Sequence, residues 1–295
     1  MGIVLPPKVI AHRGASGYRP ENTLAAFELG LLQGADGIEF DVVNTSDGAL
    51  VIRHENTLAG TTDIGTRAAF SHLQRADLIE EREINDWFTE DLTLQQVKEL
   101  RAIERMPDVR PGSAKFDGEF EIPTLREIFD SPFISDKIVV VELKAGSHLS
   151  VLDKSIGELT AEEIVNSNVL SKSISLVVES FDRELLLDTQ KHFESRGITA
   201  KFFFAIDSTK IIDCNVEELA SKFDGLSIAT HMLLSSDPWV ESCHELGLEV
   251  WVYTARAEKA TTTIEAYYEE LIQTGVDGIF ADQPDLLRRV LDERG

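Results

Sequence analysis

Short apolar runs alternate along the chain with segments whose apolar residues recur every three or four positions. The first run, residues 8–11, predicts a strand. Leu24, Phe27 and Leu31 then have the spacing of one helix face, and a second apolar run follows at residues 36–42. A strand, a helix and a strand in succession predict a β-α-β unit, so these two strands should be parallel.

Glycine recurs where a helical pattern gives way to a strand pattern, at Gly34, Gly197, Gly247 and Gly275. Glycine is the usual residue at a left-handed helix stop, so these positions predict short helix-to-strand loops. The parallel strands counted in this way are eight, at residues 8–12, 36–42, 137–144, 174–181, 200–206, 224–229, 248–254 and 276–281. Eight β-α units in one domain predict an α/β fold of the (β/α)8, or TIM-barrel, type. A doubly wound open sheet is the alternative.

An insertion interrupts this pattern after the second strand. Residues 50–54 form another strand-like run, but residues 46–48 leave room only for a hairpin, so this strand should be antiparallel to the second one. It opens an insertion at about 44–122 within a single domain of residues 1–295. Barrels of this type carry their active sites at the C-terminal ends of the strands, so we expect the insertion to cap the barrel mouth.

One helix is predicted inside the insertion, at Leu94–Arg105. Thr93 and Gln96 have the spacing of a capping box at its start. Four apolar residues would share one of its faces: Leu94, Val97, Leu100 and Ile103.

Composition and charge narrow the choice of partners. Of the 295 residues, 43% are hydrophobic and 27% charged, which is ordinary for a globular protein. The formal net charge of −24 repels nucleic acids and anionic membranes, so we expect neither as a partner. A small anionic substrate would need a locally positive pocket on this acidic protein.

Cysteines and targeting signals add little. Cys214 and Cys243 lack metal-ligand spacing and are predicted to be free thiols. Residues 1–10 lack the apolar core of a signal peptide, and no apolar run is long enough to cross a bilayer. The expected location is the cytoplasm, and the periplasm or the exterior is the alternative if a leader has been removed.

Two acidic residues lie inside the second predicted strand. Glu39 and Asp41 are two positions apart, so both side chains project from the same face of the strand. Two ionised carboxylates in a core cost several kcal/mol unless a cation compensates them. The alternative is an edge strand with one face in water.

The third strand repeats this arrangement, since it ends in Glu142 and Lys144. The oxygens of Glu39, Asp41 and Glu142 suit a hard divalent cation. Three carboxylates, one such cation and one phosphodiester together carry two negative charges, which Lys144 and Arg13 would neutralise. The strand ends are therefore expected to hold a singly charged phosphate ester.

Histidines and aromatic residues also follow the predicted strands. His12 ends the first strand and His54 ends the hairpin, although a single histidine in such a place is more often structural. Trp251 and Tyr253 share a face of the seventh strand, where they would form either core or a wall for an apolar part of the substrate. His231, after the sixth strand, is a weaker candidate for the pocket.

Six motifs are spread over nearly the whole chain. They are His12-Arg13-Gly14-Ala15-Ser16-Gly17, Pro20-Glu21-Asn22-Thr23, Glu39-Phe40-Asp41, Ser46-Asp47-Gly48 leading to His54, Glu142-Leu143-Lys144 and Gly278-Ile279-Phe280-Ala281-Asp282-Gln283-Pro284. Together they resemble the glycerophosphodiester phosphodiesterase family. That family folds as a (β/α)8 barrel with an insertion after the second strand. The long insertion here is similar to that of larger bacterial members, several of which use calcium.

The resemblance implies roles for the residues at the strand ends. Glu39, Asp41 and Glu142 would hold one divalent cation, Mg²⁺ or Ca²⁺. His12 and His54 would be the acid–base pair, without an indication of which is the acid.

The same resemblance implies that Arg13 and Lys144 bind phosphate. Trp251 and Tyr253 are further candidates for substrate binding, since they would offer a cation–π surface to a choline head group. Glu55 stands where the family commonly has aspartate.

The expected reaction is hydrolysis of a small glycerophosphodiester to sn-glycerol 3-phosphate and an alcohol. The attacking group is either the substrate's own 2-hydroxyl, which gives a cyclic phosphate, or water. The alternatives are a phosphodiesterase of the lysophospholipase D type and a non-catalytic barrel that binds phosphoesters.

Overall fold

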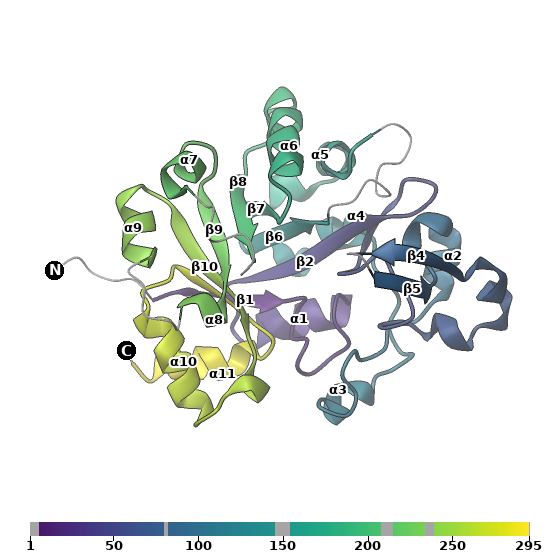
Figure 1. The fold of residues 1–295 in the computed structure, drawn as a ribbon, viewed down its shortest axis with the longest axis horizontal. Helices are drawn as coiled ribbons and strands as arrows, with labels where there is room; N and C mark the ends of the chain where they lie inside the picture. The colour runs from purple at the N-terminus through teal and green to yellow at the C-terminus, as the bar shows by residue number, and fades with distance from the viewer. Residues whose placement is uncertain (1–5, 80–81, 145–153, 208–214, 234–238, 295) are drawn as a thin grey trace.

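Eight parallel strands close into a barrel in the computed structural model, which describes residues 6–79, 82–144, 154–207, 215–233 and 239–294 (Figure 1). The last strand pairs with the first, and the first with the second, so the sheet has no parallel edge. The predicted (β/α)8 barrel is confirmed, and the open sheet is excluded. In barrel order the strands are β1 (Lys8–His12), β2 (Gly37–Asn44), β6 (Ile138–Leu143), β7 (Ser175–Ser180), β8 (Lys201–Ile206), β9 (Gly225–Ala229), β10 (Glu249–Ala255) and β11 (Gly278–Ala281).

Helices surround this barrel, and most of the apolar core lies between them and the outer face of the sheet (Figure 1). Phe27 of the first helix shows how the two layers meet, because its ring packs edge-on against Phe40 of β2 with centroids 5.8 Å apart. The helices are α1 (Leu24–Leu32), α4 (Leu125–Asp130), α5 (Ile156–Asn166), α6 (Arg183–Ser195), α7 (Val216–Ala220), α8 (Thr230–Leu233), α9 (Trp239–Glu245), α10 (Ile264–Gln273) and α11 (Pro284–Asp292). Short 3-10 turns lie at η4 (Pro132–Ile134), η6 (Val169–Lys172) and η8 (Ala257–Lys259). None of the described helices has the length and apolar composition needed to span a membrane.

The barrel interior is filled by a second, smaller apolar cluster. Its buried members project inward from six different strands and are Ile10, Val140, Val177, Phe203, Trp251 and Phe280. Phe203 and Trp251 meet edge-on with ring centroids 4.9 Å apart. We call this cluster the barrel plug. It leaves the C-terminal ends of the strands as the place where polar side chains can gather.

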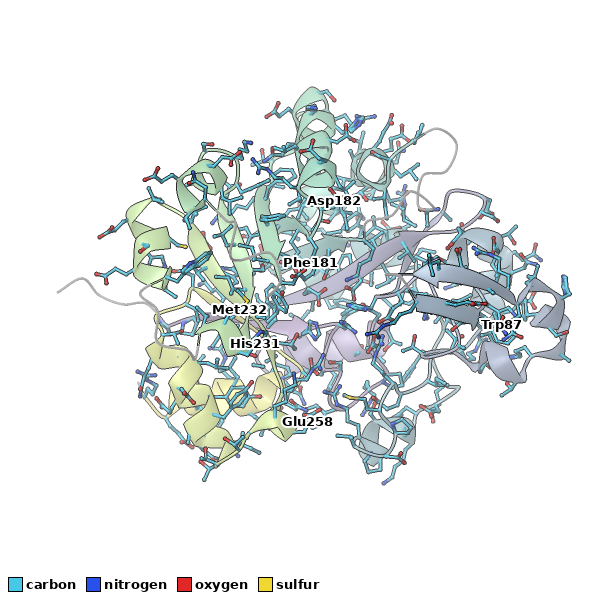
Figure 2. The ribbon with its side chains drawn as sticks, in the orientation of Figure 1. Trp87, Phe181, Asp182, His231, Met232 and Glu258 are labelled. Atoms are coloured by element: carbon cyan, nitrogen blue, oxygen red, sulfur yellow. The ribbon has the colours of Figure 1, made fainter. Side chains whose placement is uncertain are left out.

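The insertion after β2 starts with the predicted hairpin. β3 (Leu50–Ile52) pairs antiparallel with β2, with Val43 opposite Val51. These two valines join an apolar cluster within the insertion that also contains Trp87, which Figure 2 shows well away from the barrel centre. The other elements of the insertion are η1 (Asp63–Thr66), η2 (Ala68–Leu73), β4 (Arg75–Ile79), β5 (Arg82–Asp86), η3 (Thr89–Asp91), α2 (Leu94–Glu99) and α3 (Pro111–Ala114).

The predicted helix of the insertion is shorter than expected. Its capping box between Thr93 and Gln96 is present, but α2 ends at Glu99 rather than at Arg105. From Leu100 onward the backbone is extended, and Arg101 makes a bridge to Glu121 of a distant segment. The prediction of a helix to Arg105 was wrong because these long-range backbone hydrogen bonds replace the local helical ones.

Candidate active site

A cavity of about 270 Å³ opens at the C-terminal ends of the barrel strands. Most of the residues predicted from the sequence lie in its wall: His12, Arg13, Glu39, His54, Glu142, Tyr253 and His231. Phe181 and His231, both labelled in Figure 2, line this cavity. Asp41, Lys144 and Trp251 are not part of the described lining.

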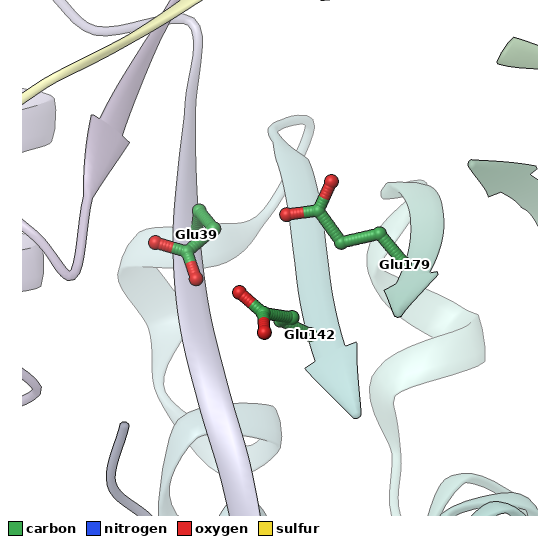
Figure 3. A group of neighbouring side chains, drawn as sticks. All are labelled: Glu39, Glu142 and Glu179. Atoms are coloured by element: carbon green, nitrogen blue, oxygen red, sulfur yellow. The ribbon is translucent and has the colours of Figure 1, made fainter. Parts of the chain in front are cut away.

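Three buried carboxylates meet in this cavity: Glu39, Glu142 and Glu179. Each offers an oxygen within 4.8 Å of the others, and all three point toward one another from neighbouring strands (Figure 3). The register places Glu142 of β6 level with Glu179 of β7, whereas Glu39 of β2 lies opposite Val140, two residues earlier on β6. Glu179 was not predicted from the sequence, although β7 carries an acid near its end as β6 does.

Asp41 shares Lys144 with Glu142 of this trio and has Asn22 and Arg13 as further partners. Its Oδ1 lies 2.7 Å from Lys144 Nζ, and its Oδ2 accepts a hydrogen bond of 2.8 Å from Asn22 Nδ2. Arg13 Nε lies 3.3 Å from the same Oδ2. Burial opposes ionisation of Asp41, but Lys144, His54 and Arg13 outweigh it and hold the pKa of this carboxyl well below its usual range. Asp41 is therefore ionised, and its negative charge is stabilised by the neighbouring cations.

The charges of the trio are only partly compensated, by Lys144 beside Glu142 and by the Ser227 hydroxyl, which donates to Glu179. Burial, together with the charges of Asp41, Glu142 and Glu179, raises the pKa of Glu39 well above its usual value. Burial and Glu142 also raise the pKa of Glu179, to about 8. Within the part of the chain that the structure describes, the buried Oε1 of Glu39 has no hydrogen-bond partner. A cation between these oxygens would remove both the repulsion and the unpaired atom, so the trio fits a hard divalent metal.

Arg13 reaches the site through an uncommon backbone conformation. Its φ of 54° is left-handed, and its backbone N–H donates a 2.8 Å hydrogen bond to Glu39 Oε2. The next residue, Gly14, also has a positive φ, and a Cβ there would come within 2.4 Å of the Ala26 backbone. The turn thus packs directly on α1 and brings the Arg13 side chain to the carboxylates.

His12 is buried at the end of β1, and a carboxylate binds one nitrogen of its ring. Its Nδ1 lies 2.6 Å from Asp282 Oδ1, and its Nε2 lies 3.4 Å from Thr254 Oγ1. Burial and the neighbouring Arg13 charge lower the pKa of His12 to about 4, against the opposing effect of Asp282. The ring is therefore neutral at neutral pH. Since Asp282 is ionised, Nδ1 carries the hydrogen and Nε2 is left to accept a proton.

His54 approaches from the insertion side of the cavity. It follows β3, and its Nδ1 lies 2.6 Å from Glu55 Oε1. Its side chain is about one-third exposed, at 31%, whereas that of His12 is 10% exposed. The two histidines thus enter one cavity from different elements, each against its own carboxylate.

A profile of the Glycerophosphoryl diester phosphodiesterase family matches residues 12–286, which include every site residue described above. The chain belongs to this family. The resemblance found in its motifs is thereby confirmed, as is the prediction that it is an enzyme of this type.

Individual glycerophosphodiester phosphodiesterases are similar along their whole length. The enzyme of Caldanaerobacter subterraneus subsp. tengcongensis is 29% identical over 290 residues, covering 97% of this chain and 98% of that protein. That of Bacillus subtilis is 26% identical and covers 95% of this chain and 85% of its own.

Solved structures agree with the fold. An Oleispira antarctica phosphodiesterase in complex with the product sn-glycerol-3-phosphate is similar with a TM-score of 0.70 and 25% identity, covering 97% of both chains. A glycerophosphodiester phosphodiesterase from Agrobacterium tumefaciens is similar with a TM-score of 0.66 and 21% identity, covering 96% of this chain and 99% of that one.

Of the two aromatic residues predicted to bind substrate, Tyr253 lies in the cavity wall and Trp251 lies in the barrel interior. Tyr253 is in the cavity wall, where its ring packs edge-on against Phe181 and its hydroxyl donates to the Ile206 carbonyl at 2.7 Å. Trp251 is only 2% exposed and belongs to the barrel plug. A Cβ at Gly278 would lie 2.6 Å from its ring, so the glycine makes room for it. Trp251 therefore has the core role that was the alternative to substrate contact.

This placement of Trp251 has a measurable consequence. Replacing Trp251 by alanine leaves a large cavity in the plug and should lower the free energy of unfolding by about 3–5 kcal/mol. Tyr253→Phe, the matched change, keeps the ring and removes one hydrogen bond, so it should cost about 0.5–1.5 kcal/mol. Urea unfolding followed by fluorescence measures both. A milder Trp251→Phe variant with unchanged stability and a raised KM would instead show that Trp251 binds substrate.

Proposed function

We propose that this chain hydrolyses glycerophosphodiesters to sn-glycerol 3-phosphate and an alcohol, with a divalent cation bound at the carboxylates and His12 and His54 as the acid–base pair. The observation that carries the proposal is the single cavity in which both histidines, the carboxylate trio and Arg13 meet. The family supplies the reaction class. A similar phosphodiesterase holds the product sn-glycerol-3-phosphate, which supports a substrate of the same class.

The charges of the site support one divalent cation. Two positive side chains, Arg13 and Lys144, lie among the four carboxylates of Glu39, Asp41, Glu142 and Glu179. Lys144 pairs with both Asp41 and Glu142. If a bound metal keeps all four carboxylates ionised, they and the two cations, Arg13 and Lys144, leave an excess of two negative charges, which one divalent ion neutralises. Glu39 and Glu142 would hold it, with Glu179 or Asp41 as the third ligand. The bound ion supplies Lewis-acid stabilisation of negative charge on the phosphoryl oxygens.

Arg13 and Lys144 are proposed to be the positive side chains that attract the phosphate into the site. Arg13 lines the cavity with its guanidinium beside Asp41 and Glu21. Burial would lower the pKa of Arg13, but Glu21 and Asp41 outweigh it and raise the pKa further, so the side chain stays charged. Lys144 lies behind the lining and acts on the phosphate through its charge.

The histidines divide the proton transfers between them. His12 is neutral, and its Nε2 has a long contact of 3.4 Å with Thr254 Oγ1, so this nitrogen is proposed to take the proton from the attacking hydroxyl. The complementary task, protonation of the leaving alcohol, falls to His54. Asp282 and Glu55 hold the two rings by their Nδ1 atoms and thereby leave both Nε2 atoms for proton transfer.

The proposed reaction has a direct test. Glycerophosphocholine is incubated with the protein, and free sn-glycerol 3-phosphate is measured enzymatically with and without EDTA. We expect release of the product, loss of release in EDTA, and recovery when Mg²⁺ or Ca²⁺ is added in excess.

The alternatives give different results in the same assay. Binding of glycerophosphocholine without product would indicate a phosphoester-binding barrel. Activity that is unaffected by EDTA would contradict the metal part of the proposal and leave the reaction class intact. A preference for lysophosphatidylcholine over glycerophosphocholine would indicate a lysophospholipase D type of enzyme.

A further inference from the structure

Arg105 belongs to the insertion and binds the carboxylate of Glu55. Glu55 in turn contacts the ring of His54. Its Nη1 donates to Glu55 Oε1 at 2.8 Å, and its Nη2 donates to Glu55 Oε2 at 2.6 Å. Two parallel hydrogen bonds of this kind fix the plane of a carboxylate as well as its position. The Glu55 side chain is 35% exposed, so this pair keeps it from rotating into water. The oxygen that Arg105 Nη1 fixes is the one that contacts His54 Nδ1.

The same guanidinium also reaches the phosphate-binding side of the cavity. Arg105 Nε donates to Glu21 Oε2, and Nη2 donates to Glu21 Oε1, both at 2.8 Å. Glu21 Oε1 in turn accepts a 3.0 Å hydrogen bond from Arg13 Nη1. Burial would raise the pKa of Glu21, but Arg13 and Arg105 lower it to about 2. Arg105 is thus the cation between two ionised carboxylates.

A second arginine of the insertion has the corresponding position for His12. Arg110 Nη2 donates a hydrogen bond to Asp282 Oδ2, whose other oxygen contacts His12 Nδ1. The rest of the guanidinium is also bound, by the Ser16 carbonyl at 3.1 Å and by Glu258 Oε1 at 2.6 Å (Glu258 is labelled in Figure 2). These contacts join the insertion to residues 94, 148 and 172 positions away along the chain.

We propose that Arg105 and Arg110 are positioning residues for the two histidines, so that the insertion takes part in arranging the acid–base pair. This inference rests on the two-histidine mechanism proposed above. Each arginine acts through a carboxylate: Arg105 through Glu55 on His54, and Arg110 through Asp282 on His12. An insertion that only selected substrates would instead contact the substrate and change KM.

The two arginines should differ in the size of their effects. Asp282 Oδ2 also accepts a 3.0 Å hydrogen bond from Arg256, and its side chain is 2% exposed. Loss of Arg110 therefore leaves Asp282 buried and still held. The Glu55 side chain is 35% exposed, so loss of Arg105 frees it more completely.

The test compares Arg105→Met with Arg101→Met. Arg101 also belongs to the insertion, but its guanidinium contacts only insertion groups among the described residues: the carbonyls of Lys98 and Leu100, and Glu121. With glycerophosphocholine as substrate, Arg105→Met should lower kcat by about 10–100-fold, the range for residues that orient functional side chains, with a smaller change in KM. Arg101→Met should leave kcat unchanged. Arg110→Met should lower kcat less than Arg105→Met does.

A double variant of Glu55 and Arg105 tells a positioning role of Arg105 apart from a general loss of structure. Because Arg105 acts through Glu55, the double variant Glu55→Gln/Arg105→Met should be no slower than the slower single variant. Arg105→Lys keeps the charge but cannot form the paired hydrogen bonds, so it should recover only part of kcat. This variant also serves if Arg105→Met does not fold, which circular dichroism would reveal.

Each outcome has a distinct meaning. Equal losses of kcat in Arg101→Met and Arg105→Met, or a raised KM with an unchanged kcat in Arg105→Met, would overturn the positioning role. Independent, multiplicative losses for Glu55→Gln and Arg105→Met would overturn it as well. His54→Ala is measured alongside: if that variant is fully active, the two-histidine mechanism itself fails, whereas an inactive His54→Ala with a fully active Arg105→Met removes only the present inference.

Discussion

Replacing either His12 or His54 by alanine is expected to lower kcat by about 10²–10⁴-fold, the range for loss of a general acid or base. Each ring lies in the wall of one cavity with its Nδ1 against a carboxylate, so each can move a proton at Nε2. Metal and substrate should still bind, because neither ring belongs to the carboxylate trio. Steady-state release of glycerol 3-phosphate at saturating metal measures the loss.

The pH dependence of kcat/KM tells the two roles apart. The wild-type profile should be bell-shaped, since the base must be neutral and the acid protonated. Burial and Arg13 lower the pKa of His12 to about 4, so a neutral base persists well into acid, and His12→Ala should remove the acidic limb. His54→Ala should remove the alkaline limb.

A surface histidine provides the control for this series. His192 lies on α6, where its Nε2 is 3.4 Å from Asp188, and His192→Ala should leave the bell unchanged. If the His12→Ala or His54→Ala enzyme were active with an unchanged bell, the paired role would be wrong. A cyclic glycerol phosphate trapped in either variant would identify the 2-hydroxyl as nucleophile, and turnover of a 2-deoxy substrate would identify water.

Replacing Glu142 by glutamine is the second change with a large expected effect. The side chain keeps its size but loses the charge of one metal ligand, and affinity for hard cations depends on the number of charged ligands. Substitution of a residue that only orients a metal ligand lowers activity by about 10–100-fold. Because Glu142 is itself a proposed ligand, activity at limiting metal should fall by more than this. Thermal unfolding should change little, because relief of the repulsion within the trio offsets the loss of the ion pair with Lys144.

Two companion variants decide the third metal ligand. Glu179→Gln weakens metal binding if the geometric trio is the site, whereas Asp41→Asn does so if Asp41 is a ligand, as the family resemblance implies. Isothermal titration with Mg²⁺ or Ca²⁺ measures affinity for the metal without relying on activity. Full activity of Glu142→Gln at limiting metal would contradict both sets, since each includes Glu142.

The barrel could be predicted from the sequence because each of its elements has a local cause. An apolar run predicted each strand, and each predicted range overlaps an observed strand, from β1 to β11. Polar residues at the strand ends, such as Arg13, Glu39 and Glu142, could be assigned to the cavity because parallel strands all end on the same side.

The other features could not be predicted from the sequence, because they depend on contacts between residues that are far apart along the chain. The helix of the insertion was predicted to reach Arg105, but pairing of Arg101 with Glu121 ended it at Glu99. Glu179 was overlooked because its role depends on its register with Glu142. Trp251 and Tyr253 share a face of their strand, and only their depth in the barrel separates a buried ring from a cavity wall.

The barrel plug has a consequence for the passage of molecules through the enzyme. Large apolar rings, among them Phe203, Trp251 and Phe280, fill the interior beneath the carboxylates and block a route through the barrel axis. In the proposed reaction, the diester would therefore enter, and both products would leave, through the cavity at the C-terminal ends of the strands. A product that has not yet departed would occupy the place of the next diester, so product release would have to precede each new binding step.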